Sequence, residues 1–370
     1  MAIVVPVEPP KSPTSPAFPT DYSSGTRQYK RDCQLLVSSP NGEFDLSSQR
    51  ISFKIHHFER NLHPQWLEAR VYNLSKNTAQ GIYSIKEGGF VRLQAGYEGN
   101  IGTIFQGDLA YVAIGRENPV DTYVDIYAGD GAYAHNFATV SKTHAAGSTP
   151  QDHWNTILDA YKQYGVTEGV VSNVDLSTPK YPRAFTLFGM ASEALRILAR
   201  SKDASAFVHL GKLNLSHNKY ADQSEVIDLN AMTGMIGMPQ ITLDGVVVRA
   251  LINPRFATRP PPKIHLNNSD IQPALPQWQP TIGGLIPSAD FQNRMQVMLA
   301  ADGIYQIYFI EWIGDTRGQP WYADITCATT GVMTQSNAIK NSMGADPAGA
   351  EGGPNDGISA LPPQKWPGTQ

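Results

Sequence analysis

Short runs of apolar residues separated by turn signals dominate the chain from residue 29 to about residue 134. Residues 51–55 alternate between apolar and polar with a period of two, which is the spacing of a half-buried β-strand. Further runs rich in β-branched and aromatic residues lie at 32–37, 66–72, 90–95, 103–114 and 122–127. Six or seven short strands divided by turns predict a β-barrel or a β-sandwich.

From about residue 149 the spacing changes to that of a helix. Thr149, Pro150 and Asp152 supply a cap, a proline at the first helical position and an early carboxylate. One helical face follows at Trp154, Ile157, Leu158 and Tyr161, and a second at Ala191, Ala194, Leu195 and Leu198. With short strands at 206–210 and 212–215, this region is predicted to be a small α/β insert.

The β pattern returns from residue 225. Strands are expected at 226–229, 241–243, 246–252, 263–266 and 295–300. The stretch 232–239, with two glycines and a proline, is expected to be a loop, and 263–266 is similar in pattern to 90–93. The excursion from 267 to about 290 is rich in proline and glycine, and such a long loop in a compact domain is usually functional or disordered.

The last strand pair, residues 304–315 and 321–327, repeats features of the pair at 110–115 and 122–127. At one fixed offset, Ile114 and Gly115 align with Ile313 and Gly314, and Tyr123, Asp125 and Ile126 align with Tyr322, Asp324 and Ile325. Five identities are weak evidence alone, because hairpins share a limited set of residues. They nevertheless suggest that the chain carries two copies of one β-module.

These patterns predict a mainly β fold with a small α/β insert, two similar β-barrel modules and extended arms at both ends. The expected domains are a proline-rich arm (1–28), a first barrel (29–147), the insert (148–222), a second barrel with the long loop 267–290 (223–332) and a flexible tail (333–370). Proline fixes φ and removes backbone donors, so the arm is not expected to form a helix or a central strand.

Composition narrows the range of functions. The 370-residue chain has 17% charged residues, below the roughly 25% usual for globular domains, and a net charge of -4. A protein that binds nucleic acid through phosphates needs a basic patch, which this sequence lacks. Cys33 and Cys327 do not suffice for a disulfide framework or a cysteine-based zinc site, and indicate two buried thiols. No apolar run approaches 18 residues, so we expect no membrane insertion, and synthesis in the cytoplasm.

No catalytic signature is present. The sequence contains no Gly-x-Ser-x-Gly elbow, no His-Glu-x-x-His and no phosphate-binding loop. The densest candidate clusters are His56, His57 and His63, and Asp121, Asp125 and Asp130. Histidines on both faces of a strand end make a poor metal site, and the aspartates are expected at solvent-facing positions of a hairpin and its turn. We therefore predict no catalytic, cofactor-binding or metal-binding residues and no cofactor.

The glycine and proline pattern of 233–239, continuing through 244–254, resembles that of the baseplate hub proteins of tailed bacteriophages. That superfamily is shared with the hub portion of type VI secretion spikes. Gly96-Tyr97-Glu-Gly99 before Ile104-Phe105-Gln-Gly107 also fits, as does the order of β-module, insert, β-module and tail. The resemblance covers about residues 30–330.

The resemblance implies a structural virion protein of the tail baseplate. It would form a homotrimer whose six barrels make a pseudo-sixfold ring, joining the hexameric tail tube to the trimeric spike and contacting other baseplate proteins. DNA would only pass through the lumen, which suits the mildly acidic balance. Two alternatives stay open: a β-rich tail enzyme acting on cell-wall or surface glycan, and a receptor-binding baseplate component.

Overall fold

The structure is a computed structural model and describes residues 28–39, 42–58, 63–85, 88–217, 224–242, 245–258, 261–267, 270–271 and 303–329. The arm before residue 28, the expected strand at 295–300, nearly all of the 267–290 excursion and the tail from residue 330 lie outside these ranges. The predictions made for those segments therefore stay predictions.

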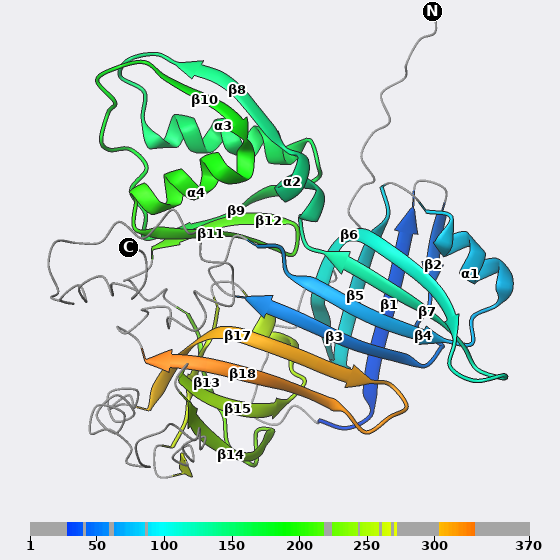
Figure 1. Ribbon diagram of the computed structural model, residues 1–370. Helices are drawn as coiled ribbons and strands as arrows, with labels where there is room; N and C mark the ends of the chain where they lie inside the picture. Colours follow the sequence, from blue (N-terminus) through cyan, green and yellow to red (C-terminus); the bar gives the residue numbers. More distant parts are fainter. Residues whose placement is uncertain are drawn as a thin grey trace, which may run out of the picture. The chain divides into compact units, whose positions relative to one another are not determined.

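A 13-stranded sheet contains the strands of both predicted β-modules (Figure 1). Its first half comprises β1 (Arg31–Ser39), β2 (Gly42–Asp45), β3 (Ile51–Phe58), β4 (Trp66–Tyr72), β5 (Phe90–Tyr97), β6 (Asn100–Arg116) and β7 (Thr122–Gly129). Its second half comprises β13 (Val226–Asp228), β14 (Met235–Thr242), β15 (Gly245–Leu251), β16 (Lys263–His265), β17 (Ile304–Asp315) and β18 (Trp321–Thr329). The strand order is β14-β15-β18-β17-β3-β4-β7-β6-β5-β1-β2, with β16 branching from β17 and β13 pairing with β16.

The open sheet differs from the two closed barrels that the sequence predicts. Within the described residues, β3 pairs with β17 in antiparallel register, from Ser52 opposite Asp315 to Phe58 opposite Phe309. The backbone groups at an exposed strand edge favour pairing with another strand. Here the edge strand β3 of one module forms backbone hydrogen bonds with the edge strand β17 of the other, so strands of both modules share one sheet. The prediction of a mainly β fold is confirmed.

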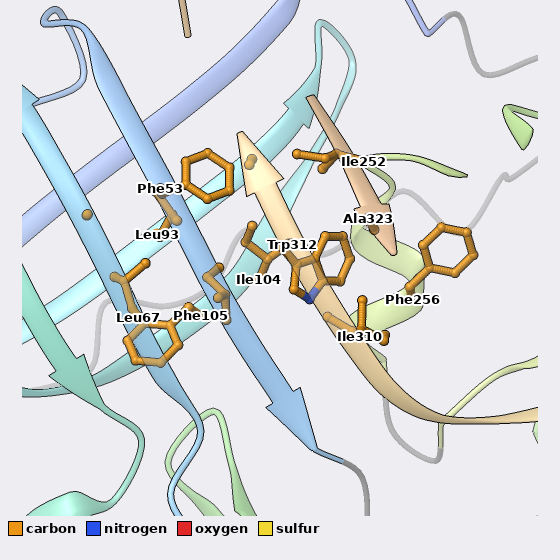
Figure 2. Close-up of a cluster of buried hydrophobic side chains, with 14 of the residues drawn as sticks. Phe53, Leu67, Leu93, Ile104, Phe105, Ile252, Phe256, Ile310, Trp312 and Ala323 are labelled. Carbon is orange, nitrogen blue, oxygen red and sulfur yellow. The ribbon is translucent and has the colours of Figure 1, made fainter. Parts of the chain in front are cut away.

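One hydrophobic core follows this sheet through both halves. Phe53 on β3 and Trp312 on β17 are both buried, and the Trp312 ring lies 6.3 Å from that of Phe256 in the short 3-10 helix η1 (Pro254–Ala257). Figure 2 shows these side chains together with Leu67 and Leu93 in one cluster. Burying aromatic side chains of this size supplies much of the stability of such a core. The two halves therefore share a core as well as a sheet.

The insert has a core of its own. It contains α2 (Ala132–Phe137), α3 (Pro150–Lys162), α4 (Ala191–Ser201), the paired strands β8 (Thr139–His144) and β10 (Phe185–Met190), and a sheet of β9 (Thr167–Ser172), β11 (Ala204–His209) and β12 (Lys212–His217). This second core includes Ala134, Ala138 and Val140, which precede the expected start at residue 148. Strand β8 belongs with the insert because it pairs only with β10 among the described strands.

The start of α3 is as predicted. The Asp152 carboxylate accepts hydrogen bonds from the backbone N–H of Thr149 at 2.8 Å and from its hydroxyl at 3.0 Å. These bonds lower the pKa of Asp152. Pro150 occupies the first helical position, where a missing N–H costs nothing. The predicted apolar face of Trp154, Ile157, Leu158 and Tyr161 is buried.

One local expectation is wrong, and one helix has no counterpart among the predicted elements. Residues 235–239 form part of strand β14 rather than a loop, because a register shift between Ile236 and Gln240 accommodates Gly237 at a φ of 73°. Such bulges let a strand continue through an unfavourable stretch. The helix α1 (Lys76–Tyr83) stands where the sequence predicts none. Its cap is Ser75, whose hydroxyl accepts a hydrogen bond from the Thr78 N–H.

Candidate functional site: the repeated strand pairs

The first copy of the repeated module holds an arginine, an aspartate and a tyrosine on two paired strands. Arg70 on β4 lies directly opposite Asp125 on β7. Its Nε donates to Asp125 Oδ1 at 2.7 Å and its Nη2 to Oδ2 at 2.9 Å, a two-pronged ion pair. The same guanidinium carbon lies 3.9 Å from the centre of the Tyr123 ring. We call these three residues the first Arg–Asp–Tyr cluster.

The second copy holds the same arrangement on β15 and β18. Arg249 lies opposite Asp324, and its Nε donates to Oδ1 at 2.6 Å while its Nη2 donates to Oδ2 at 2.8 Å. The guanidinium carbon lies 4.1 Å from the centre of the Tyr322 ring. These residues form the second Arg–Asp–Tyr cluster. The two clusters match atom for atom in their hydrogen bonds and in the stacking of arginine on tyrosine.

The clusters test the repeat that the sequence suggests. Two of the aligned identities, the tyrosines and the aspartates, occupy matching places in them. The arginines escaped the sequence comparison because Arg70 and Arg249 do not align at the offset that relates β7 to β18. Looking for an arginine on the strand paired with each aspartate would have found them. The geometry supports strand-by-strand equivalence of β4 with β15 and of β7 with β18.

The Ile–Gly identity on the other strand of each hairpin is out of register by one residue. Tyr123 faces Gly115, whereas Tyr322 faces Ile313 and Gly314 faces Trp321. The cause is the connection, since loop length fixes hairpin register. In the first hairpin the Glu117 N–H donates to the Asp121 carbonyl, and in the second the Asp315 N–H donates to the Pro320 carbonyl. The second hairpin loop is therefore one residue longer than the first. Strand pairing therefore equates Tyr111 with Phe309, Val112 with Ile310 and Ile114 with Trp312.

Each aspartate stabilises the charged form of the arginine that it accepts from. Hydrogen bonding to Asp125 raises the pKa of Arg70, and hydrogen bonding to Asp324 raises that of Arg249. Each guanidinium is also placed over an aromatic face, where a cation is attracted to the ring. With both charges matched, each cluster holds one strand against the next. Chemically, this arrangement can fix the register of neighbouring strands.

The structure separates the three histidines considered as a metal site. The His56 ring stacks on Trp66 at 4.3 Å, and His57, on the opposite face of β3, lies 4.8 Å from the His209 ring. His63 lies 5.9 Å from His135. Burial lowers the pKa of His56, outweighing the raising effect of Glu311. Among the described residues, no group of three or more His, Cys, Asp or Glu side chains could hold a metal ion.

The three aspartates lie in different environments. Asp121 accepts hydrogen bonds from Asn73 and Asn118 at the hairpin turn, and Asp125 belongs to the first cluster. The expectation of a solvent-facing Asp130 is wrong, because its side chain is buried. The carboxylate follows β7 and accepts the backbone N–H groups of the turn between β11 and β12.

That turn joins the insert to the sheet. Leu210 and Gly211 both have positive φ, as a two-residue hairpin turn requires, and their N–H groups donate to Asp130 at 2.5 and 2.9 Å. Gln106 on β6 donates to the Leu210 carbonyl at 2.6 Å. His209, beside the turn, lies 2.8 Å from the Ala257 carbonyl through its Nε2. Buried polar groups of this kind are costly unless paired, so their mutual pairing fixes the turn on the sheet.

No family model matches the chain, and no curated protein matches it. A solved tail protein from Neisseria meningitidis has a similar structure, with a TM-score of 0.50 and 10% sequence identity over 83% of this chain and 99% of that one. The chain shares the fold of that tail protein. At this identity the likeness concerns the fold alone, and at the level of the fold it confirms the resemblance to a tail protein.

Two other solved structures align at lower scores. A prophage tail protein from Shewanella oneidensis has a TM-score of 0.46 and 10% identity over 81% of this chain and 98% of that one. An Escherichia coli protein described as a component of the type VI secretion system has a TM-score of 0.41 and 9% identity over 83% and 76%. Among the described residues of this chain, no helix is long and apolar enough to cross a membrane.

Proposed function

We propose that this chain is a structural component of a phage tail, a baseplate hub that assembles as a homotrimer. The observation that carries the proposal is the repetition of the Arg–Asp–Tyr cluster in two halves of one tail-protein fold. A chain with two equivalent modules presents two equivalent surfaces, so three chains present six. Such an assembly adapts a threefold axis to a sixfold one.

In this role the trimer forms a pseudo-sixfold ring between a hexameric tail tube and a trimeric spike, and contacts other baseplate proteins in the virion. DNA passes through the ring without being held. The net charge of -4 supports that part of the proposal, because a lumen that bound phosphates tightly would oppose movement of the DNA. Closed symmetric assembly buries the complementary surfaces of every copy. The hub needs no catalytic group or cofactor for any of these tasks.

Mass measurement tests the proposal. Size-exclusion chromatography with light scattering on the full chain is expected to give three times the 40.4 kDa chain mass at micromolar concentration. Negative-stain images of the same fraction are expected to show rings with six similar lobes. A monomer at that concentration, with no rings in images of intact particles, would contradict the homotrimeric hub. Clearing of a cell-wall zymogram by the purified chain would instead support the enzyme alternative.

A further inference from the structure

Strand β6 has an outer edge that no described strand covers. Its first part pairs with β5 up to Asp108, and the Leu109 N–H bonds to the Gly89 carbonyl. From Tyr111 to Arg116, β6 pairs only with β7 among the described strands. Unpaired N–H and C=O groups along a strand edge are a ready template for another strand.

The equivalent part of β17 is covered. Residues 309–315 of β17 pair with β18 on one side and with β3 on the other. Strand pairing equates Phe309 with Tyr111, so the covered part of β17 corresponds to the uncovered part of β6. The second module therefore has its edge filled from within the chain, and the first module does not.

Strand β14 is the counterpart of β3. Ser52 on β3 lies opposite Arg70 of the first cluster, and Ile236 on β14 lies opposite Arg249 of the second. β3 uses its other edge to join β17. The other edge of β14 ends the sheet, since β15 is its only partner among the described strands. The chain thus contains a counterpart of each strand of the β3–β17 pair, β14 for β3 and β6 for β17, and the corresponding edge of each counterpart is uncovered among the described strands.

Both open edges expose apolar side chains. Tyr111 is 62% exposed and Ile114 46%, whereas Trp312, which pairing equates with Ile114, is fully buried. On β14, Ile236 is 39% exposed and Met238 50%. A partner strand would remove this surface from water, which is favourable for apolar groups. Edge strands of folded proteins are protected by charge, proline, bulges or covering segments. β14 has a bulge between Ile236 and Gln240 and a proline at 239, yet it still exposes apolar side chains, as β6 does, and apolar exposure at an open edge is typical of an interface.

We propose that β14 of one copy of this chain pairs antiparallel with the outer edge of β6 in a second copy, in the manner of β3 on β17. The occupant is a second copy because the chain itself holds the template of the join. Pro239 has no N–H and lies in the bulge between Ile236 and Gln240, so it donates no hydrogen bond to the join. The apolar side chains and the remaining backbone groups make the contact.

This contact is head-to-tail, because each copy offers one β6 edge and one β14 edge. Head-to-tail contacts generate a closed ring where the rotation closes and a filament where it does not. In a ring of three copies, three β3–β17 pairings within chains alternate with three β14–β6 pairings between chains. The ring then has six similar strand pairings. The inference rests on the proposed self-assembly and assigns its surfaces.

Crosslinking between two differently tagged chains tests the assignment. One full-length chain carries Ile114→Cys and the other carries Met238→Cys, and both are co-expressed and treated with a short bis-maleimide. The native Cys33 and Cys327 are buried and give a low background. We expect a crosslinked product with both tags in the pair, and none when either variant is present alone. Replacing Met238→Cys by Phe188→Cys, on the 84% exposed Phe188 of β10, is expected to abolish the product.

A charge on either edge gives a second readout. Ile114→Lys and Met238→Lys are each expected to shift the chain from assembly to monomer in light scattering at micromolar concentration, because pairing would bury the ammonium group. Phe188→Lys is the matched control and is expected to leave the assembly intact. Unchanged circular dichroism of the three variants checks that each one folds.

The outcomes separate this inference from the proposed function. A wild-type trimer that gives no two-tag product, and that both lysine variants leave intact, overturns the edge assignment while the hub proposal stands. A two-tag product from filaments or from rings of another size supports the edges and contradicts the trimer. A product that forms equally with Phe188→Cys overturns the edge assignment.

Discussion

The hairpin β6–β7 and the hairpin β17–β18 are two versions of one structure with different surroundings. Each pairs with a third strand that supplies an arginine to an Arg–Asp–Tyr cluster, β4 in the first case and β15 in the second. The difference lies at the outer edge. β17 is covered there by β3, and the matching part of β6 is not covered by any described strand. Equivalent modules in one chain thus differ in what they leave available for other copies.

This difference shows that one chain can contain both a complete pairing of two edge strands, β3 with β17, and two open edges, on β6 and β14, that match that pairing. The internal join keeps the two modules in one sheet and fixes their spacing. In the proposed assembly, the open edges of β6 and β14 repeat the same join between chains. Substitutions at matched positions of the two hairpins should therefore have unequal effects on one chain, and the inequality can be measured.

The largest difference is expected between Trp312→Ala and Ile114→Ala. Trp312 is fully buried beside Phe256 at the internal join, and truncating such a side chain costs about 3–5 kcal/mol of unfolding free energy. Ile114, its counterpart by pairing, is half exposed, and its truncation is expected to cost less than about 1 kcal/mol. Urea unfolding followed by circular dichroism, at a concentration where both variants are monomeric, checks this. Equal losses would contradict the difference between the two edges.

The next difference is between Gly314→Ala and Gly115→Ala, two glycines that align in the sequence although strand pairing places them one residue apart. A Cβ at Gly314 would lie 2.3 Å from the ring of Phe53, which is buried in the shared core. A Cβ at Gly115 would lie 2.4 Å from the Tyr123 ring, which is partly exposed and can move. Overpacking a core costs about 1–3 kcal/mol, so we expect a loss of that size for Gly314→Ala and a smaller one for Gly115→Ala. Thermal unfolding of the two variants measures the order, and a reversed order would count against the register assigned here.

The smallest difference is expected between the clusters themselves. Arg70→Ala and Arg249→Ala each remove a two-pronged ion pair and an arginine stacked on tyrosine. Both arginines are partly exposed, with side chains 39% and 46% accessible, so solvent screening holds each loss to about 1 kcal/mol. Double-mutant cycles with Asp125→Ala and Asp324→Ala isolate the pair energies. Coupling energies that agree within about 0.5 kcal/mol are expected, and coupling in only one cluster would show that they are not equivalent.

Local patterns predicted much of the fold. The alternation at 51–55 and the helical face from Trp154 to Tyr161 both reflect burial on one side of an element, which the sequence records directly. Helix α1 was missed because it is short, and its Ser75 cap is easily read as part of a turn. The expected loop at 235–239 is a strand because β15 supplies a partner for it, and pairing over long distances leaves little local trace.

The sequence alone identifies only part of each Arg–Asp–Tyr cluster. The tyrosines and aspartates of the two clusters stand at a fixed offset, and the sequence comparison found them. Their arginines come from strands whose distance along the chain differs between the copies, so no single offset reveals them. The one-residue change of register arises from the hairpin loops and could not be seen in the aligned letters. The buried Asp130 was misplaced because its partners, Leu210 and Gly211, lie in the distant insert.

A reconstruction of the assembled full-length chain by electron cryo-microscopy would show which strand, if any, covers the outer edge of β6. We expect three chains in a closed ring, with β14 of each chain antiparallel to the outer edge of β6 in the next, as β3 lies on β17 within the chain. A ring in which the outer edge of β6 faces solvent, or is covered by a segment of its own chain, would contradict it.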